Sequence, residues 1–566
     1  MSKRGPRAAS TSRLGFWLAH VAVALAASLL LGWNLGSRYL WQDEAATAVM
    51  AERMLRHGKP LAYDGRNLIT MDTYDAELAD KLATMPPQEV VQLLVERGDF
   101  KADTTWIGQP WGQFVATALS LAALGKNTLA ARLPFALCGI ATVVLLFHLV
   151  WQRFRDWPMA LVTVLLLLSN VFWVLHVRQC RYYALSTFFL LLTFAAYLRW
   201  SDDKRFGAWA LVASAWCLFQ SDYGAFWPTA GVLFAHAMWS GSRPRLGALV
   251  TFGVLALTVA PWVYYYELVS RYKPKYASLE SNILTSLFNY NQFQFPILGL
   301  VLLAILLFRK SPHLAGGEGR RVAGLAIFVS LALLVWVPLV SPYPFYRYIM
   351  PATPLAALSL AYVVLGSIDW MFAGRAANDL RVVAALPLTA LLAFTALVAL
   401  PVSLLIPLQD RAIPEFGTAF RAEFGALYID LLDEGPDPNR DVIELLAPQL
   451  KPGDEVLVNY EDVPYMFYTD ATVRGGMCAF RTEAPDDGHL KFAVIRPNLR
   501  IGHQALLREL ARFDWRGSYD HVLAIPWGNI PDPKHHRFQR KEPPPAVIVL
   551  EATGPRTHKS QAQPTP

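Results

Sequence analysis

Long apolar stretches recur along this chain of 566 residues and restrict what it can fold into. As a helix, a stretch of about 18 apolar residues or more can cross the roughly 30 Å of hydrocarbon in a bilayer. Charged residues make up 17% of the chain, whereas a soluble domain carries about 25%. We therefore predict a mainly α-helical, polytopic membrane protein.

Basic residues between the apolar stretches decide the predicted topology. If the short stretch 110–124 spans the membrane, four basic loops face outward, against the positive-inside rule. If it is a short helix at the outer face, all four loops lie in the cytoplasm together with the N-terminus. The second alternative predicts about eleven spans, at 14–34, 129–151, 158–176, 184–200, 206–220, 223–240, 246–268, 294–308, 322–340, 345–368 and 381–407.

Two regions follow from this topology. Residues 1–407 form the membrane domain, with a large outer first loop at 35–112, and 269–293 is a further outer loop. Residues 408–566 form a small soluble α/β domain on the same side. Within it, "DVIELLAPQL" predicts a helix, the residues after "KPGD" predict a strand, and "HVLAIPW" and "PAVIVLEA" predict two more. The last stretch, "TGPRTHKSQAQPTP", is predicted to be disordered.

Two adjacent carboxylates, Asp43 and Glu44, follow the first apolar stretch directly. The residues after them predict an amphipathic helix that ends at Gly58. A carboxylate at a helix N-terminus is favoured by the helix dipole, so Asp43 could serve only the helix. Alternatively, Asp43 is a general base held at the membrane surface, where it takes a proton from a hydroxyl nucleophile.

Three arginines share the predicted outer side with this pair: Arg178, Arg181 and Arg347. Arginines at this depth can simply extend to lipid headgroups. A guanidinium also suits a phosphate, because its planar fork of donors matches the phosphate oxygens. Neighbouring tyrosines fit an interfacial belt. These are Tyr182, Tyr183, Tyr346 and Tyr348. The pattern fits an enzyme that acts on a phosphate-bearing lipid, and it also fits a lipid transporter.

Four blocks of sequence resemble one enzyme family in the family's own order. They are "WQDEAATAVMAERMLRHGKPL", "GQPWGQFVATALSLAALGKNTLAARLP", "VRQCRYYAL" and "YRYIMPATP". Together they resemble the GT-C glycosyltransferases of the protein-mannosyltransferase type, which include the lipid A aminoarabinose transferases. Where many relatives carry Lys or His before the prolines of the second block, this chain has Gln109.

The resemblance implies a sugar donor on a polyprenyl phosphate, bound at the outer face of a bacterial inner membrane. Asp43 matches the catalytic base, and direct attack of the acceptor hydroxyl inverts the anomeric carbon. Glu44 would orient Asp43 or contact the acceptor, which is a glycan, a lipid or a protein. Arg181 and Arg347 match positions that hold the donor phosphate. To these we add Arg178 and Tyr348 for the phosphate, and Gln109 and Tyr183 as substrate contacts.

Two other functions stay open at this stage: a lipid-linked glycan ligase or polymerase, and a lipid or glycan transporter. A ligase or polymerase usually has a large outer loop late in the chain. A transporter usually has inverted repeats and charged residues near the middle of the membrane. An acidic insertion in the first loop is either solvated, a cover for the site, or a site for a divalent metal. Its acids are Asp64, Asp72, Asp75, Glu77 and Asp80. The net charge of +7 lies largely in short loops, so we predict no nucleic-acid partner.

Overall fold

The computed structural model describes part of the chain. The described residues are 13–70, 85, 87–96, 100–240, 244–269, 278–293, 317–341, 345–371, 431–432, 437–475, 479–480, 489–496, 510, 513–524 and 546–555.

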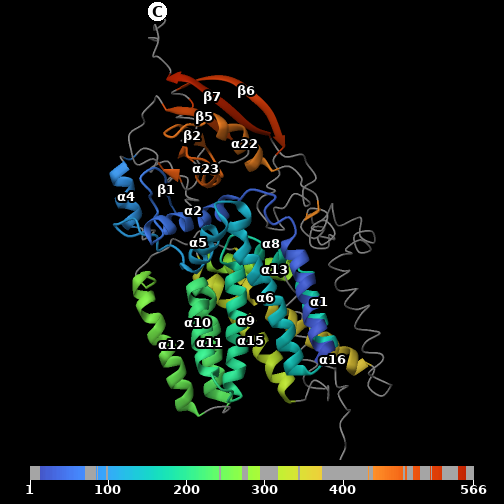
Figure 1. Cartoon of the computed structure of the whole chain (residues 1–566). Helices are drawn as coiled ribbons and strands as arrows, with labels where there is room; N and C mark the ends of the chain where they lie inside the picture. The colour runs from blue at the N-terminus through green and yellow to red at the C-terminus, as the bar shows by residue number, and fades with distance from the viewer. Residues whose placement is uncertain are drawn as a thin grey trace, which may run out of the picture.

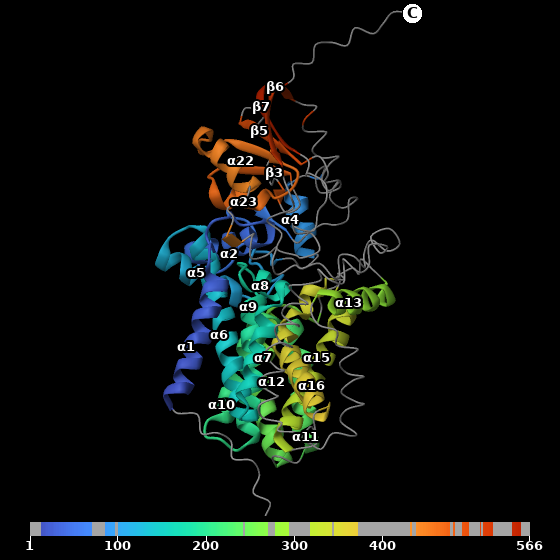
Figure 2. The same cartoon turned by 90° about the vertical axis from the view of Figure 1, so that its right-hand side faces the viewer.

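Helices of the membrane domain run side by side, and the strands gather beyond one end of this bundle (Figures 1 and 2). Within the described residues, five helices are long and apolar enough to cross a bilayer. They are α1 (Arg13–Gly32), α6 (Thr128–Phe154), α9 (Tyr183–Ser201), α12 (Arg245–Tyr265) and α15 (Gly317–Val340). The prediction of a mainly helical membrane protein with a small C-terminal α/β region is confirmed.

The predicted span at 158–176 is not one helix. It is divided into α7 (Trp157–Leu168) and α8 (Val171–Val177), which are bent by 71°. The Asn170 side chain accepts a hydrogen bond from the Trp173 N–H at 2.8 Å and so caps a new helix. The pair counts as a sixth candidate span only if both helices are taken together.

Several other predicted spans are helices whose bounds differ from the predicted ones. Two of them are α10 (Gly207–Ser221) and α11 (Tyr223–Ser240). The span predicted at 345–368 starts as a 3₁₀ turn, η1 (Tyr346–Ala352), and continues as α16 (Thr353–Met371). The spans at 294–308 and 381–407 lie outside the described residues, so the total of eleven stays a prediction. Part of the loop predicted at 269–293 is a helix, α13 (Leu279–Phe293).

Short helices of the segment predicted as the first outer loop, which we name the first outer segment, lie between the bundle and the sheet (Figure 1). They are α2 (Gln42–His57), α4 (Pro87–Glu96) and α5 (Gly112–Leu124). The end of α2 is at Gly58, as predicted, whose φ of 74° is left-handed and favours glycine. The 13 residues of α5 are fewer than the roughly 20 that a span needs, in agreement with the predicted short helix.

Within the described parts of the chain, the sheet has seven strands in the order β1-β4-β3-β2-β5-β7-β6. The strands are β1 (Leu68–Ile69), β2 (Glu455–Val458), β3 (Thr472–Gly475), β4 (Ala479–Phe480), β5 (Leu490–Ile495), β6 (Phe513–Ala524) and β7 (Ala546–Pro555). β2 pairs in parallel with β3 and β5, and the other pairings are antiparallel. Strand β1 comes from the first outer segment, so segments from both ends of the chain share one sheet.

Helices α22 (Pro438–Leu446), η2 (Ala447–Gln449) and α23 (Asp462–Tyr468) complete the C-terminal region. The helix and turn predicted before β2 are present as α22 and a turn at Gly453, and the predicted final strands lie in β6 and β7. Residues 553–555, predicted as disordered, are instead in β7, because Phe513 pairs with Pro555 and extends the ladder. Residues 556–566 lie outside the described part.

Candidate active site

Asp43 lies in the first turn of α2, at the end of the bundle that faces the sheet (Figure 1). Trp41 precedes the helix in an extended conformation, with φ −85° and ψ 173°. Its side chain has no oxygen that could accept the free N–H groups at the helix start. Glu44 accepts a hydrogen bond from the Trp41 N–H at 3.4 Å. The start of α2 therefore depends on contacts made by other parts of the chain.

Two arginines converge on Asp43. Arg181 places Nη2 at 3.2 Å from Asp43 Oδ2, and its Nη1 donates to the Asp43 backbone oxygen at 3.2 Å. Arg347 places Nη2 at 3.6 Å from the same carboxylate oxygen. The three side chains are between 9% and 13% exposed. The structure thus brings together one carboxylate and two guanidinium groups at a place with little exposure to solvent.

Arg181 stands just before α9, where the chain turns after the bent pair α7–α8. Burial by itself lowers the pKa of its guanidinium, but Asp43 outweighs this effect and raises the pKa above its ordinary value. Arg181 therefore stays charged. Its Nε atom is buried and makes no hydrogen bond within the described part of the chain. A donor of this kind, next to a charged pair, is suited to an anionic ligand.

Glu44 forms a buried ion pair with a different arginine. Its carboxylate is bound by Arg132 of α6, with oxygen–nitrogen distances of 2.6 and 2.8 Å, and it accepts a hydrogen bond from the Cys180 N–H at 2.8 Å. Glu44 is 1% exposed. It therefore joins α2 to α6 and to the residue before Arg181. Arg132 was missed in the sequence, although a charge inside an apolar stretch is a signal of a functional or structural partner.

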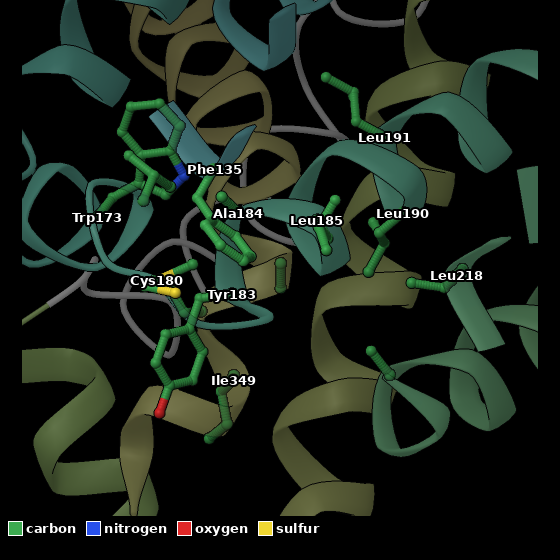
Figure 3. Close-up of a cluster of buried hydrophobic side chains, with 14 of the residues drawn as sticks. Phe135, Trp173, Cys180, Tyr183, Ala184, Leu185, Leu190, Leu191, Leu218 and Ile349 are labelled. Atoms are coloured by element: carbon green, nitrogen blue, oxygen red, sulfur yellow. The ribbon is translucent and has the colours of Figure 1, made fainter. Parts of the chain in front are cut away.

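Tyr183 and Tyr348 flank the two arginines. Tyr183 is fully buried and lies within electrostatic range of Arg347, Arg181 and Asp43. In Figure 3 it belongs to a packed cluster with Cys180, Ile349 and other apolar side chains. The Tyr348 ring centre lies 6.0 Å from the Arg347 guanidinium carbon. This packing fixes the segments that carry the two arginines.

Two further residues predicted for the site, Arg178 and Gln109, have hydrogen bonds to other segments. Arg178 donates to the backbone oxygens of Leu30 and Trp33 at 2.8 and 2.6 Å, where it satisfies carbonyl groups at the end of α1. Gln109 reaches Asp43 only through other side chains, Gln113 and Thr47.

This relay contains a hydrogen bond between the two glutamines and one from the Thr47 hydroxyl, whose single proton can reach only one of two acceptor oxygens at a time. Gln113 donates to Gln109 at 2.9 Å, and Thr47 lies 3.3 Å from both the Gln113 side-chain oxygen and the Asp43 backbone oxygen. Gln113 and Thr47 are fully buried. The relay therefore ties α5 to the first turn of α2, and Gln109 stands at its far end.

The acidic insertion is described only at Asp64, because the other four acids lie outside the described residues. Arg53 donates to Asp64 at 2.9 Å and also binds three backbone oxygens of the loop. Burial alone would raise the pKa of Asp64, but Arg53 and the backbone N–H groups of Arg66 and Asn67 bring it below its ordinary value. Asp64 is therefore a structural acid. Among the described residues, no group of three or more His, Cys, Asp and Glu is placed to hold a metal.

Asp222 is a further acid near the site, between α10 and α11. It accepts hydrogen bonds from the Ser186 hydroxyl at 3.0 Å and from the Ala225 N–H at 3.1 Å. Burial raises its pKa to about 6. Asp222 therefore changes its charge close to neutral pH while it holds the start of α11.

An apolar cavity of about 1060 Å³ lies between α11 and α12. Its lining is formed mainly by aromatic and aliphatic side chains of these two helices, together with Gly231. Lys101 and Glu267 are its charged members, and Lys101 Nζ lies 3.8 Å from the ring centre of Tyr265. The cavity therefore offers an apolar surface along helices of the bundle and charged groups in the same lining.

Solved structures with the same architecture exist, although no family model and no curated protein sequence matches the chain. One is ArnT from Cupriavidus metallidurans bound to undecaprenyl phosphate, with a TM-score of 0.54 and 15% identity over 95% of this chain and 98% of that one. Another is the same protein in the apo state, with a TM-score of 0.57 and 14% identity over 96% of this chain and 98% of that one. Since the likeness extends over nearly the whole of both chains, the protein has the GT-C fold of ArnT, as its sequence motifs predict.

Proposed function

We propose that the chain is a membrane glycosyltransferase that moves a sugar from a polyprenyl-phosphate donor to an acceptor hydroxyl. The observation that carries this proposal is the convergence of Arg181 and Arg347 on Asp43 at the end of the helical bundle. The fold supports it, because an ArnT structure of this fold is bound to undecaprenyl phosphate. The reaction would take place at the outer face of the inner membrane.

The proposed chemistry is one displacement at the anomeric carbon. The Asp43 carboxylate takes the proton of the acceptor hydroxyl, and the hydroxyl oxygen attacks the anomeric carbon from the face opposite the phosphate. The bond from that carbon to the phosphate oxygen breaks, and the polyprenyl phosphate leaves with the electron pair. The configuration is therefore inverted. Arg181 and Arg347 stabilise the charge that develops on the leaving phosphate.

Glu44 is a positioning residue in this proposal. Its carboxylate accepts two hydrogen bonds from the Arg132 guanidinium and a third from the Cys180 N–H. The Glu44 side chain thus fixes the position of Asp43, which precedes it in α2. It also fixes the position of Arg181, which follows Cys180. Contact with the acceptor would break this ion pair, so orientation is the role that the geometry favours.

The donor's lipid chain needs an apolar path beside the site. The cavity between α11 and α12 has the volume and lining for a long hydrocarbon chain. Its lining continues toward the first outer segment through Lys101. We therefore place the polyprenyl chain in this cavity.

The test begins with a strain that lacks this protein. Mass spectrometry of its polyprenyl-linked sugars identifies the donor that accumulates, and the missing glycan modification identifies the acceptor. Purified protein should then transfer that sugar from the lipid monophosphate. Asp43→Asn keeps the shape of the side chain but cannot take the proton, so turnover should fall by about 10²–10⁴-fold while undecaprenyl phosphate still binds.

Any one of three outcomes would refute the proposal. Transfer from a lipid diphosphate donor only would indicate a ligase or polymerase. Near-normal turnover of Asp43→Asn would show that this carboxylate serves only the helix. Movement of a labelled lipid across vesicles containing the purified protein, without transfer of its sugar, would indicate a transporter.

A further inference from the structure

We propose that the C-terminal region positions the base: it grips the chain immediately before Asp43 and thereby fixes the first turn of α2. This inference rests on the proposed function of Asp43. The gripping residues come from α22 and α23 and from the short loops before them. We name this set of contacts the clamp, and its central members are Gln42 and Asp462.

The clamp holds the backbone of the extended segment before α2. The Tyr39 N–H donates to Asp437 at 2.5 Å, and the Leu40 N–H donates to the Tyr468 hydroxyl at 3.0 Å. The Asn439 amide donates to the Leu40 oxygen at 3.3 Å. The rings of Tyr39 and Tyr468 are stacked, with centres 3.9 Å apart. Buried backbone groups need partners, and here they find them in a region about 400 residues away.

Gln42 is the residue next to Asp43, and both ends of its amide are used. Its Nε2 donates to Asp462 Oδ1 at 2.6 Å, and its Oε1 accepts from the Val463 N–H at 3.3 Å. Gln42 is 2% exposed, and Asp462 is fully buried. Because hydrogen bonds between buried groups are sensitive to their partners' geometry, the position of α23 determines where the first turn of α2 lies.

The residue directly before α23 has a strained backbone conformation. Glu461 precedes Asp462 and has a φ of 58°, a conformation that costs a non-glycine residue about 1 kcal/mol or more. The amide of Asn439 donates to Glu461, and Arg496 lies 4.0 Å from it. Burial raises the pKa of Glu461, and Asp437 and Asp43 contribute to the increase. The clamp thus brings its own buried acid within electrostatic range of the base.

The clamp also reaches the membrane bundle. The Tyr468 hydroxyl, which binds Leu40, lies 2.6 Å from the Thr128 hydroxyl at the start of α6. α6 carries Arg132, the partner of Glu44. Asp43 is therefore fixed from two sides, by α6 through Glu44 and by α23 through Gln42.

A charge swap tests the clamp in the full-length protein. Gln42→Glu places a second carboxylate against Asp462, where two negative charges repel. The double variant Gln42→Glu with Asp462→Asn keeps the total charge and restores the pair, because the new amide donates to the new carboxylate. The control is Asp470→Asn, which removes an exposed ion pair between Arg66 and the same C-terminal region and keeps the hydrogen bond from Arg66 to the backbone oxygen of residue 470.

We expect the single variant to lose at least about tenfold in kcat, with an unchanged Kd for undecaprenyl phosphate. Hydrogen exchange should rise in residues 38–46. The double variant should regain kcat to within about threefold of the wild type and reverse the rise in exchange. The control should match the wild type in all three measurements.

Unchanged exchange and kcat in the single variant would overturn the inference, and so would a double variant no better than the single one. The exchange measurement needs no substrate. If wild-type protein transfers no sugar while exchange rises in the single variant and falls back in the double, the proposed function fails and the clamp stands.

Discussion

At the residue scale, the two arginines that meet Asp43 differ in the contacts that they make with it. Arg181 contacts both the carboxylate and the backbone oxygen of Asp43, whereas Arg347 makes an ion pair with the carboxylate at 3.6 Å. Arg347 lies in a 3₁₀ turn, and its guanidinium carbon lies 4.3 Å from the ring centre of Phe345. The looser pair is the one that an incoming phosphate can exchange more readily, so we assign the donor's phosphate mainly to Arg347.

Arg347→Ala should therefore weaken binding of undecaprenyl phosphate by about 30-fold or more, since loss of one partner of a buried charge pair costs about 2 kcal/mol or more. Arg199→Ala is the matched control, because this exposed arginine lies at the other end of α9 from Arg181. Titration of the purified variants with a labelled lipid phosphate measures both. Equal affinities for the two variants would contradict the assignment.

Asp222 gives the protein a pH-dependent stability. Its folded-state pKa of about 6 exceeds the ordinary value of 3.8, so the folded state binds the proton more tightly than the unfolded state. The contribution of Asp222 is thus fully present below about pH 4 and is lost as the pH rises to about 6. Asp222→Asn keeps an oxygen for Ser186 and Ala225 and removes the titration.

The thermal midpoint of the wild type in detergent should fall relative to Asp222→Asn between pH 4.5 and pH 7, by an amount equivalent to roughly 1–3 kcal/mol. Thermal scans of both proteins across this pH range measure the difference. Parallel curves would show that Asp222 does not titrate in this window.

At the element scale, α11 and α12 line the open cavity that we assign to the lipid chain. Gly231 on α11 lines the cavity, and a Cβ atom there would meet no atom within 4 Å. Gly253 on α12 also faces open space but is not part of the lining. The two glycines form a matched pair, because each tolerates a side chain and only one changes the cavity.

Gly231→Leu should raise KM for a long-chain polyprenyl donor by about tenfold, equivalent to about 1.4 kcal/mol, because it fills space that the lipid chain would use. Gly253→Leu should leave KM near the wild-type value. A donor with a short lipid chain should not distinguish the two variants. Identical KM values for both variants with the long-chain donor would place the chain elsewhere.

At the scale of the whole molecule, the sequence predicted what depends on local patterns. The apolar stretches predicted the bundle, and the order of the four motifs predicted the GT-C fold. The bend between α7 and α8 had a local signal too, since Ser169 and Asn170 interrupt an apolar run and Asn is a favoured N-cap. The resemblance selected Asp43, Arg181 and Arg347, and these three side chains meet in the structure.

Contacts between distant segments carried no such signal. Nothing in the sequence around Arg132 indicates that this residue pairs with Glu44, which is 88 residues away. The clamp joins segments that are about 400 residues apart, and its side chains, such as Gln42 and Tyr468, are ordinary in helices. The hydrogen bonds from Arg178 to carbonyl groups at the end of α1 also had no signal in the sequence, and its role in phosphate binding stays a prediction.

Because β1 pairs with β4, part of this protein can fold only after nearly the whole chain has been synthesised. Asn67, beside β1, binds the backbone of Val473, which is 406 residues later in the chain. At about 5–20 residues per second, a ribosome needs roughly 20–80 s to make the intervening chain. During that interval the first outer segment has neither its sheet neighbours nor the groups that hold Gln42. Each molecule can therefore complete the surroundings of Asp43 only after its C-terminal region has been made, and unfinished chains hold the acid in an unassembled site.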